Sequence, residues 1–276
     1  MHMGRKIRLD VLLVEKGYVE TREKAKRTIM AGLVFHNQVR LDKPGQKIEE
    51  ETELTVKGKA IPYVSRGGLK LEKALNVFDV SVKDKIMIDI GSSTGGFTDC
   101  ALQNGAKLSY AIDVGYNQLD WSLRNHEQVV VMERTNFRYV TENELTEGQP
   151  QFASIDVSFI SLRIILPVLA TILEEQGDVI ALIKPQFEAG REQVGKKGII
   201  KDSEIHKEVV ETILDFAIDH GYSVCGLTFS PITGGDGNIE FLVHLRLTKD
   251  AKGKVVDGVD IGAVINEAHE AHSKNA

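Results

Sequence analysis

The sequence predicts an α/β protein built around a mostly parallel sheet and preceded by a small α+β unit. From about residue 65 onward, continuous apolar segments alternate with amphipathic ones, as expected for parallel strands covered by helices on both faces. The last two apolar segments are separated only by the turn-rich stretch PITGGDGN, so they should pair as an antiparallel hairpin. The first 57 residues instead combine short amphipathic helices with short strands.

Charge is distributed unevenly along the 276 residues, a length that allows one large domain and a small one. Residues 1–64 contain 13 Lys+Arg and 9 Asp+Glu, a balance of +4. Because the formal net charge of the whole chain is −6, residues 65–276 carry −10. A basic front end on an acidic body predicts that the N-terminus contacts a polyanion.

Two observations argue against metal and membrane functions. Cys100 and Cys225 have no partner at metal-ligand spacing, so no metal site is expected. The longest apolar runs, such as residues 164–173, are too short to cross a bilayer, and the chain does not open on a signal-peptide pattern. We therefore expect a cytoplasmic protein that needs no membrane.

The predicted N-terminal unit comprises residues 1–57. Its first helix is expected at residues 9–15, and Thr21 is the expected N-cap of a second helix over residues 22–31. Short strands LVFHN and QVR follow, then a KPG turn and the segment ETELTVKG. Gln38 is poorly suited to the positive φ that a two-residue hairpin often requires.

This succession resembles the S4 RNA-binding domain, in the segments TREKAKRTIMAG, LVFHNQVRL and KPGQKI. The resemblance implies binding to structured RNA through its shape and its phosphates. The basic residues expected to make these contacts in the unit are Arg5, Lys6, Arg8, Arg22, Lys26 and Arg27. A second basic set is expected at the border of the cleft of the larger domain: Arg66, Lys196, Lys197 and Lys201.

Residues 58–64 are the predicted linker, because Gly58 and Pro62 interrupt regular structure, and residues 65–276 are the predicted larger domain. Its strands are expected in KIMIDIG, LSYAIDVG, VVVMERT, FASIDVSF, VIALIKP, YSVCGLTFS and EFLVHLRL. Seven strands with a terminal antiparallel hairpin describe a class I (Rossmann-like) methyltransferase sheet better than an ordinary dinucleotide-binding sheet.

The strongest signal for a ligand is IMIDIGSSTGGFTDCAL, in which a strand leads through a glycine- and serine-rich turn into a helix. The turn lacks G-x-G-x-x-G and G-K-S/T, which argues against a nicotinamide cofactor and against a phosphate loop. The cofactor-binding residues predicted here are Asp89, Gly91, Ser92, Ser93, Thr94, Gly95, Gly96 and Phe97.

Two polar residues at the ends of the next strands extend this predicted site. Asp113 ends the second strand, where a carboxylate can bond the ribose hydroxyls of either NAD or S-adenosylmethionine. Asn136 follows the third strand on the same edge, near where an adenine would lie. Both residues are therefore predicted to bind the cofactor.

Four ionisable residues are expected to meet at one cleft. Asp156 and Lys184 end the fourth and fifth predicted strands, and open α/β sheets bind ligands outside such carboxyl ends. Lys70 lies in the helix that opens after SRGG, and Glu240 begins the last strand. A lysine at the mouth of a buried strand is costly to desolvate, but a single one often pairs with a carboxylate for structural reasons alone. Two lysines and two acids converging on one nucleoside site favour a catalytic role.

The order Lys–Asp–Lys–Glu, with DIGSSTGGF between the first two, resembles the FtsJ-like ribose 2′-O-methyltransferases. Together with the S4-like unit it resembles the TlyA group, the haemolysin A-like ribosomal RNA methyltransferases, and the match covers nearly the whole chain. The resemblance implies S-adenosylmethionine as cofactor and 2′-O-methylation of cytidine in 16S and/or 23S ribosomal RNA, on ribosomal subunits. It also implies a catalytic tetrad: Lys70, Asp156, Lys184 and Glu240.

Several alternatives are left open by the sequence. Lys184 could act as a neutral base, or as a cation that stabilises the developing alkoxide while Asp156 orients it. Rival functions are an NAD(P)-linked oxidoreductase, a cytolysin and a non-catalytic RNA-binding ribosome factor. A pore-former should show a segment able to enter a bilayer, and none is evident in the sequence. The sequence does not specify an oligomeric state.

Overall fold

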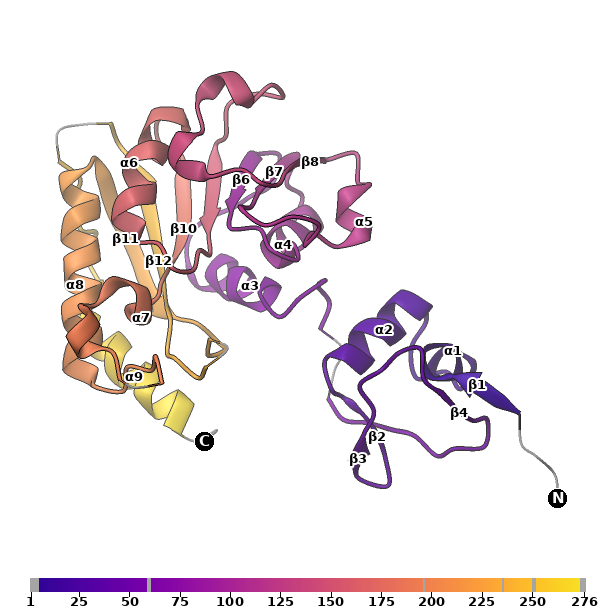
Figure 1. Cartoon of the computed structure of the whole chain (residues 1–276). Helices are drawn as coiled ribbons and strands as arrows, with labels where there is room; N and C mark the ends of the chain where they lie inside the picture. Colours follow the sequence, from indigo (N-terminus) through magenta and orange to yellow (C-terminus); the bar gives the residue numbers. More distant parts are fainter. Residues whose placement is uncertain (1–4, 59–60, 196, 235, 250–251, 274–276) are drawn as a thin grey trace. The chain divides into compact units, whose positions relative to one another are not determined.

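The computed structural model shows a chain of two units, Met1–Arg66 and Gly67–Ala276 (Figure 1). Each unit has its own hydrophobic core. The residues that the structure describes are 5–58, 61–195, 197–234, 236–249 and 252–273.

The smaller unit is built on two helices, α1 (Leu9–Glu15) and α2 (Arg22–Met30), at the positions predicted from the sequence. Thr21 caps α2 as expected, since its Oγ1 accepts a hydrogen bond from the Lys24 N–H at 3.2 Å. The helices bury one apolar face against the short strands. The fully or nearly fully buried side chains of this core are Ile7, Leu9, Leu12, Leu13, Val19, Ala25, Ile29, Val34 and Leu54.

The described part of the smaller unit also has five short strands, in two antiparallel sheets with the orders β1-β4 and β3-β2-β5. They are β1 (Lys6–Arg8), β2 (Val34–His36), β3 (Val39–Arg40), β4 (Lys47–Glu49) and β5 (Thr55–Val56).

The two-residue turn between β2 and β3 places Asn37 and Gln38 at positive φ, 46° and 67°. Gln38 thus adopts the conformation to which its side chain is poorly suited. Two successive residues at positive φ give the turn a twist that matches the right-handed twist of the flanking strands. The pairing of β2 with β3 therefore outweighs the local preference of one residue.

Seven strands form the sheet of the larger unit, and each lies in a segment predicted to be a strand. They are β6 (Ile86–Ile90), β7 (Leu108–Ile112), β8 (Val129–Met132), β9 (Phe152–Ile155), β10 (Asp178–Ile183), β11 (Tyr222–Phe229) and β12 (Phe241–Leu247). Their order is β11-β12-β10-β9-β6-β7-β8. β12 pairs antiparallel with both β10 and β11, while the other pairs are parallel, so the predicted fold and its antiparallel hairpin are confirmed.

Helices cover both faces of this sheet (Figure 1). α6, α8 and α9 pack together on one side, and α3 packs against α4 on the other. The helical segments are α3 (Gly68–Val77), α4 (Gly96–Gln103), α5 (Trp121–Arg124), α6 (Leu162–Ile172), α7 (Pro185–Glu188), α8 (Ser203–Asp219) and α9 (Ile261–Ser273), with 3₁₀ turns η1 (Phe137–Tyr139), η2 (Glu142–Glu144) and η3 (Arg191–Gln193).

The central strands are buried along their whole length. Every residue of β9 and β10 is buried, as predicted for parallel strands with a helical layer on each face. Each fully buried Leu, Ile or Phe contributes about 1.5–3 kcal/mol relative to an exposed position. This rigid core fixes the strand ends, and the strand ends carry the polar residues of the candidate site.

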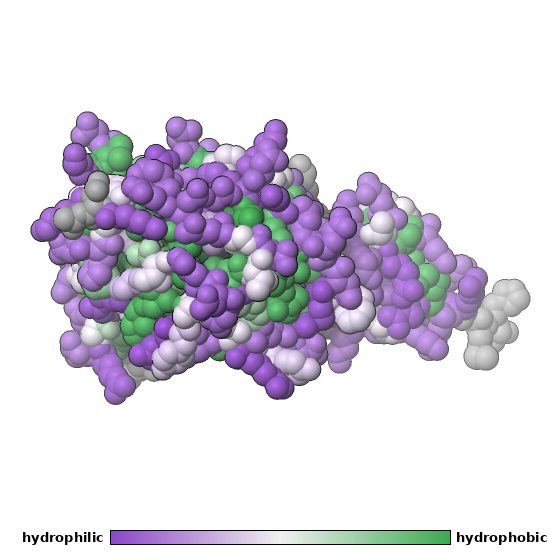
Figure 2. Space-filling model, turned by 90° about the horizontal axis from the view of Figure 1, so that it is seen from above, coloured by the Kyte–Doolittle hydropathy of each residue, from purple (hydrophilic) through white to green (hydrophobic). Residues whose placement is uncertain are grey.

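Hydrophilic residues cover most of the face drawn in Figure 2, with hydrophobic patches set among them on the larger unit. Among the residues that the structure describes, none of the helices combines the length and the apolar character needed to span a bilayer.

Candidate active site

Strand direction brings the four predicted catalytic residues to one edge of the sheet. Asp156 and Lys184 directly follow the adjacent parallel strands β9 and β10. Because β12 runs antiparallel to β10, its first residue, Phe241, pairs with the last residue of β10, Ile183. Glu240 just before β12 therefore lies at the same edge, and α3 supplies Lys70.

The side chains of the tetrad form a continuous chain of ion pairs. Lys184 Nζ lies 2.6 Å from Asp156 Oδ1, and Lys70 Nζ lies 3.1 Å from Asp156 Oδ2. Lys70 Nζ also lies 2.8 Å from Glu240 Oε2. The structure thus brings together all four residues, which are separated by up to 170 positions in the sequence.

Burial makes these ion pairs strong and their disruption costly. Lys70, Lys184 and Glu240 are almost completely buried. Burial by itself would lower the pKa of Lys70, but the carboxylates of Asp156 and Glu240 outweigh it and the pKa is raised. Burial likewise opposes ionisation of Asp156, yet Lys70 and Lys184 lower its pKa. Removing one partner of such a buried pair costs about 3–5 kcal/mol.

Two neutral side chains extend this network. Lys184 Nζ donates a hydrogen bond to Ser158 Oγ at 3.2 Å, and Gln186 Nε2 donates one to Glu240 Oε1 at 3.4 Å. Gln186 Oε1 is buried and has no hydrogen-bond partner among the described residues. A buried acceptor without a partner is uncommon in a folded protein, so Gln186 Oε1 is a candidate for binding a substrate hydroxyl.

A cavity of about 670 Å³ opens beside Asp156. Of the predicted cofactor-binding residues, Gly91, Ser93, Asp113 and Asn136 line it. Its volume lies within the range typical of small-molecule sites. Its other walls are largely apolar and include Ile90, Ile112, Val114, Phe137, Val157, Ile160, Ile164 and Ile165. Apolar walls together with a carboxylate and an amide suit a nucleoside group, so the residues present fit S-adenosylmethionine.

The glycine-rich turn before α4 needs its glycines for close packing. Gly91 and Gly95 have φ values of 81° and 100°. A Cβ at Gly91 would overlap the carbonyl oxygen of Asp156, and a Cβ at Gly95 would overlap the side chain of Leu123. The Ser93 N–H donates to Asp113 Oδ2 at 2.8 Å, which ties the turn to the end of β7.

Asp89 is buried, joins the first turn of α4 to β9, and does not line the cavity. Its Oδ2 accepts hydrogen bonds from the Thr98 N–H at 3.1 Å and the Thr98 hydroxyl at 2.8 Å, and Oδ1 accepts one from Ser154 Oγ. Burial raises the pKa of Asp89 to about 6, despite these bonds. The other predicted turn residues that do not line the cavity are Ser92, Thr94, Gly95, Gly96 and Phe97.

Phe159 and Phe187 are functional candidates that the sequence analysis missed. Both line the cavity, and their ring centroids lie 4.8 Å apart. Phe159 is 91% exposed and has a φ of 64°, a conformation that is strained for a residue with a side chain. The Phe187 ring centroid lies 5.9 Å from Lys184 Nζ. A pattern of apolar residues predicts burial, so it gave no sign that the Phe159 ring is exposed.

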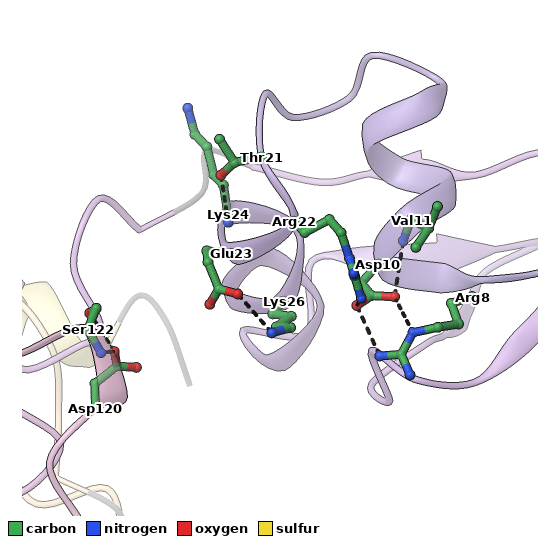
Figure 3. Close-up of polar contacts among 10 residues, drawn as sticks. All are labelled: Arg8, Asp10, Val11, Thr21, Arg22, Glu23, Lys24, Lys26, Asp120 and Ser122. Carbon is green, nitrogen blue, oxygen red and sulfur yellow. Dashed lines mark hydrogen bonds and ion pairs between the residues drawn. The ribbon is translucent and has the colours of Figure 1, made fainter. Parts of the chain in front are cut away.

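The predicted RNA-binding residues of the smaller unit have different environments (Figure 3). Arg8 and Arg22 both contact the buried carboxylate of Asp10, whereas Lys26 pairs with the exposed Glu23 at 2.8 Å. Lys6 lies 3.6 Å from Glu49. Arg5 and Arg66 are exposed, and Arg27 is half-buried.

The remaining predicted basic residues lie elsewhere in the larger unit. Lys197 and Lys201 line a separate cavity of about 530 Å³ beside the start of α8, and not the cavity next to Asp156. Lys196 falls outside the described residues. Within the described ranges, no group of three or more His, Cys, Asp or Glu residues is arranged to hold a metal ion.

Comparison with known proteins gives matches for both units. The FtsJ-like methyltransferase family matches residues 63–247, and the S4 domain matches residues 7–54. A Bacillus subtilis protein, YqxC, provisionally named an rRNA methyltransferase, is 65% identical over 268 residues, 97% of this chain and 95% of its own.

Two further relatives cover most of the chain. The Mycobacterium tuberculosis 16S/23S rRNA (cytidine-2′-O)-methyltransferase TlyA is 39% identical over 249 residues, 90% of this chain and 92% of its own. A solved structure from Streptococcus thermophilus, provisionally named a hemolysin, is 59% identical with a TM-score of 0.78, and the match covers 98% of each chain.

Proposed function

The chain belongs to the FtsJ-like methyltransferase family and carries an S4 domain, and we propose that it methylates the ribose 2′-hydroxyl of a cytidine in ribosomal RNA. It is an RNA methyltransferase, with S-adenosylmethionine as the donor that its fold implies. The observation that carries the proposal is the chain of contacts at 2.6–3.1 Å that joins Lys184, Asp156, Lys70 and Glu240 beside the cavity.

The cavity next to Asp156 is the proposed S-adenosylmethionine site. When bound, the cofactor supplies a methyl group on a positively charged sulfur. Asp113 would hold the ribose hydroxyls and Asn136 the adenine, while the Gly91 turn allows close approach of the backbone. The Asp113 carboxylate is oriented for this role, because it accepts hydrogen bonds from the N–H groups of Ser93 and Gly115.

The tetrad would bind and orient the ribose that accepts the methyl group. A ribose 2′-hydroxyl is a weak nucleophile at neutral pH. Lys70 stays protonated because its pKa is raised, and Lys184 donates a hydrogen bond to Ser158 Oγ while paired with Asp156. These contacts favour Lys184 as a cation that stabilises the charge developing on the 2′-oxygen, rather than as a neutral base.

An aromatic surface beside the tetrad would hold the base of the target nucleotide. Phe159 projects into solvent next to Phe187, and sequence-specific RNA recognition often stacks unpaired bases on such rings. A target nucleotide in a duplex must be flipped out of the helix to reach the methyl group. Stacking on an exposed ring offsets part of that cost, about 1–3 kcal/mol for each base.

Ribosomal RNA is the proposed substrate for two reasons. The 39%-identical relative TlyA is named for 2′-O-methylation of cytidine in 16S and 23S rRNA, and it spans nearly the whole chain. The S4 domain lies in the part of the sequence with a positive charge balance, where a polyanion would be bound.

The test is transfer of tritiated methyl from S-adenosylmethionine to purified 30S subunits, 50S subunits and free rRNA from a strain that lacks the homologous enzyme. We expect label in ribosomal RNA, in a dinucleotide that resists alkaline hydrolysis, because a 2′-O-methyl group blocks cleavage at that position. Lys184→Ala should retain S-adenosylmethionine binding and lose about 10²- to 10³-fold in rate.

Label in an alkali-labile product would contradict ribose methylation, and absence of label from all three substrates would contradict the proposed substrate. Haemolysis by the purified protein that survives Lys184→Ala would support the cytolysin alternative.

A further inference from the structure

Asp10 is the most completely buried charged residue among the described residues of the smaller unit, and it lies at the predicted RNA-binding surface. Asp10, the second residue of α1, has no exposed side-chain area. Two arginines from different elements converge on it, Arg8 from the end of β1 and Arg22 from the start of α2 (Figure 3).

The contacts satisfy both carboxylate oxygens of Asp10. Oδ1 accepts from Arg8 Nε at 2.9 Å and from the Val11 N–H at 3.1 Å. Oδ2 accepts from Arg8 Nη2 at 3.0 Å and from Arg22 Nη2 at 2.9 Å. Arg8 therefore makes a bidentate contact with both carboxylate oxygens. Oδ2 accepts a hydrogen bond from each of the two guanidinium groups.

This geometry presents positive charge outward and keeps the negative charge beneath it. The side chains of Arg8 and Arg22 are 45% and 54% exposed, while that of Asp10 is 0% exposed. Two arginines and one aspartate leave a net charge of +1 at the surface. The guanidinium N–H groups that Asp10 does not use are available to a further acceptor.

The KPG turn packs against the same cluster. The carbonyl of Pro44 accepts a hydrogen bond from the Asp10 N–H at 3.1 Å. A Cβ at Gly45 would lie 3.4 Å from Arg8 Nη1, so the turn passes close to the guanidinium group.

We propose that Asp10 is a positioning residue that holds Arg8 and Arg22 as one preorganised site for an RNA phosphodiester group. The inference rests on the proposed function of the smaller unit in binding RNA. Free arginine side chains lose rotamer freedom when they bind phosphate, and Asp10 has already fixed these two. Arginine forks match phosphate geometry, whereas Lys24 and Lys26 pair with exposed glutamates and lack this support.

The test compares two substitutions that each remove one negative charge from the smaller unit. Asp10→Asn releases the two arginines, and Glu23→Gln releases only Lys26. The full-length proteins are titrated with labelled 16S and 23S rRNA transcripts at several KCl concentrations, without S-adenosylmethionine. Added positive charge alone would tighten binding of both variants.

We expect Asp10→Asn to weaken RNA binding about tenfold and to reduce the slope of log affinity against log salt by about one to two. Glu23→Gln should bind as tightly as the parent or more tightly. Equal RNA affinities of the Asp10→Asn and Glu23→Gln proteins would overturn the proposal, and Asp10 would then have a structural role only.

Arg8→Lys and Arg22→Lys provide the test if Asp10→Asn fails to fold. Both keep the charge and a cation beside Asp10, but neither keeps the guanidinium group. We expect each to weaken binding about fivefold. Lys24→Arg is the unchanged control, because Lys24 pairs with the exposed Glu20 and is not among the predicted RNA contacts. Equal binding by all three variants would refute the proposal. These titrations measure RNA binding and not methyl transfer. A protein that binds RNA as expected but does not methylate it would therefore contradict the proposed enzymatic function and leave the role of Asp10 standing.

Discussion

Asp156 is the residue on which the candidate active site is centred. Each of its carboxylate oxygens contacts a different lysine, Oδ1 with Lys184 and Oδ2 with Lys70. Its lowered pKa makes it a weak base, so it serves better to orient the two cations than to accept a proton. Lys70 in turn is shared with Glu240, which means that replacing any one member leaves a buried charge incompletely paired.

Replacing Phe159 should reduce activity without reducing thermal stability. Phe159→Gly should leave thermal stability nearly unchanged, because glycine accepts a φ of 64° and the lost ring is 91% exposed. The kcat/KM for methylation of rRNA should fall about 5- to 160-fold through loss of stacking, about 1–3 kcal/mol. Methyl-transfer kinetics and a thermal unfolding scan measure the two effects.

Two controls belong with the Phe159 variant. Phe159→Tyr should keep activity because the ring is retained, and Tyr139→Ala tests removal of another exposed ring, one that does not line the cavity. An increased Kd for S-adenosylmethionine in Phe159→Gly would show instead that the ring shapes the cofactor cavity.

The sequence allowed prediction of which ionisable residues meet, but not of how exposed or how paired each side chain is. Lys184 and Asp156 could be predicted to meet because buried parallel strands fix where their ends lie. The exposed ring of Phe159 and the pairing of Arg8 with Asp10 could not, because both depend on loop conformation and side-chain rotamers. Asp89 shows the same limit: its place at the end of a strand predicted cofactor binding, but its side chain is buried and does not line the cavity.

At the scale of elements, β12 is the strand that completes the site. It is inserted between β10 and β11 and runs against both, so its start meets the end of β10. The sequence indicated the hairpin through the short turn-rich segment before β12. The insertion next to β10 could not be predicted from that segment, because strand order depends on tertiary packing.

The other end of the β10–β12 pair is held by Asp178, which gives a pH-dependent prediction. Burial would raise its pKa, but hydrogen bonds from His244 and Lys85 lower it to about 2. A lowered pKa stabilises the fold above the unfolded value near 4, and this stabilisation is lost as pH falls toward 2. Asp178→Asn should therefore lower the free energy of unfolding by about 2 kcal/mol at pH 7, and by progressively less below pH 4.

Urea unfolding of the parent and the Asp178→Asn protein between pH 7 and pH 2.5 measures this difference. Asp219→Asn is the matched control, because Asp219 pairs with Lys252 at the surface and should cost little at any pH. A difference between parent and Asp178→Asn that stays constant down to pH 2.5 would contradict the assigned pKa.

Helix α9 lies beyond the segment that matches the FtsJ-like family and supports the residues around Glu240. His269 of α9 lies 2.9 Å from the ring of the buried His206, which packs edge-on against Phe241. His206 is neutral at pH 7, because burial and then His269 lower its pKa to about 4. His269→Ala would leave His206 without this partner, at a cost of about 1–3 kcal/mol.

We expect His269→Ala to lower the melting temperature and to reduce kcat severalfold while the Kd for S-adenosylmethionine stays the same. His220→Ala is the control, since His220 stacks on Phe216 at the exposed end of α8. A melting temperature equal to that of the parent would show that α9 docks without the His206 contact.

At the scale of the whole molecule, the boundary between the two families' matches coincides with the change in charge balance along the chain. The S4 match at residues 7–54 lies in the part with a positive charge balance, and the FtsJ-like match at residues 63–247 lies in the acidic remainder. Composition alone indicated this division, because net charge sums over many residues and does not depend on rotamers. The boundaries of the predicted domains, 1–57 and 65–276 with a linker between them, remain a prediction.

A protein that contains only residues 65–276 tests both the boundary and the division of labour. All residues of the tetrad and of the cavity next to Asp156 lie within it, together with its own hydrophobic core. We expect the Kd for S-adenosylmethionine, measured by calorimetry, to change less than twofold. The kcat/KM for ribosomal RNA should fall about 100-fold, and most of the salt dependence of RNA binding should disappear with the basic unit. Methylation at the parent rate would show that the larger unit recognises the RNA alone.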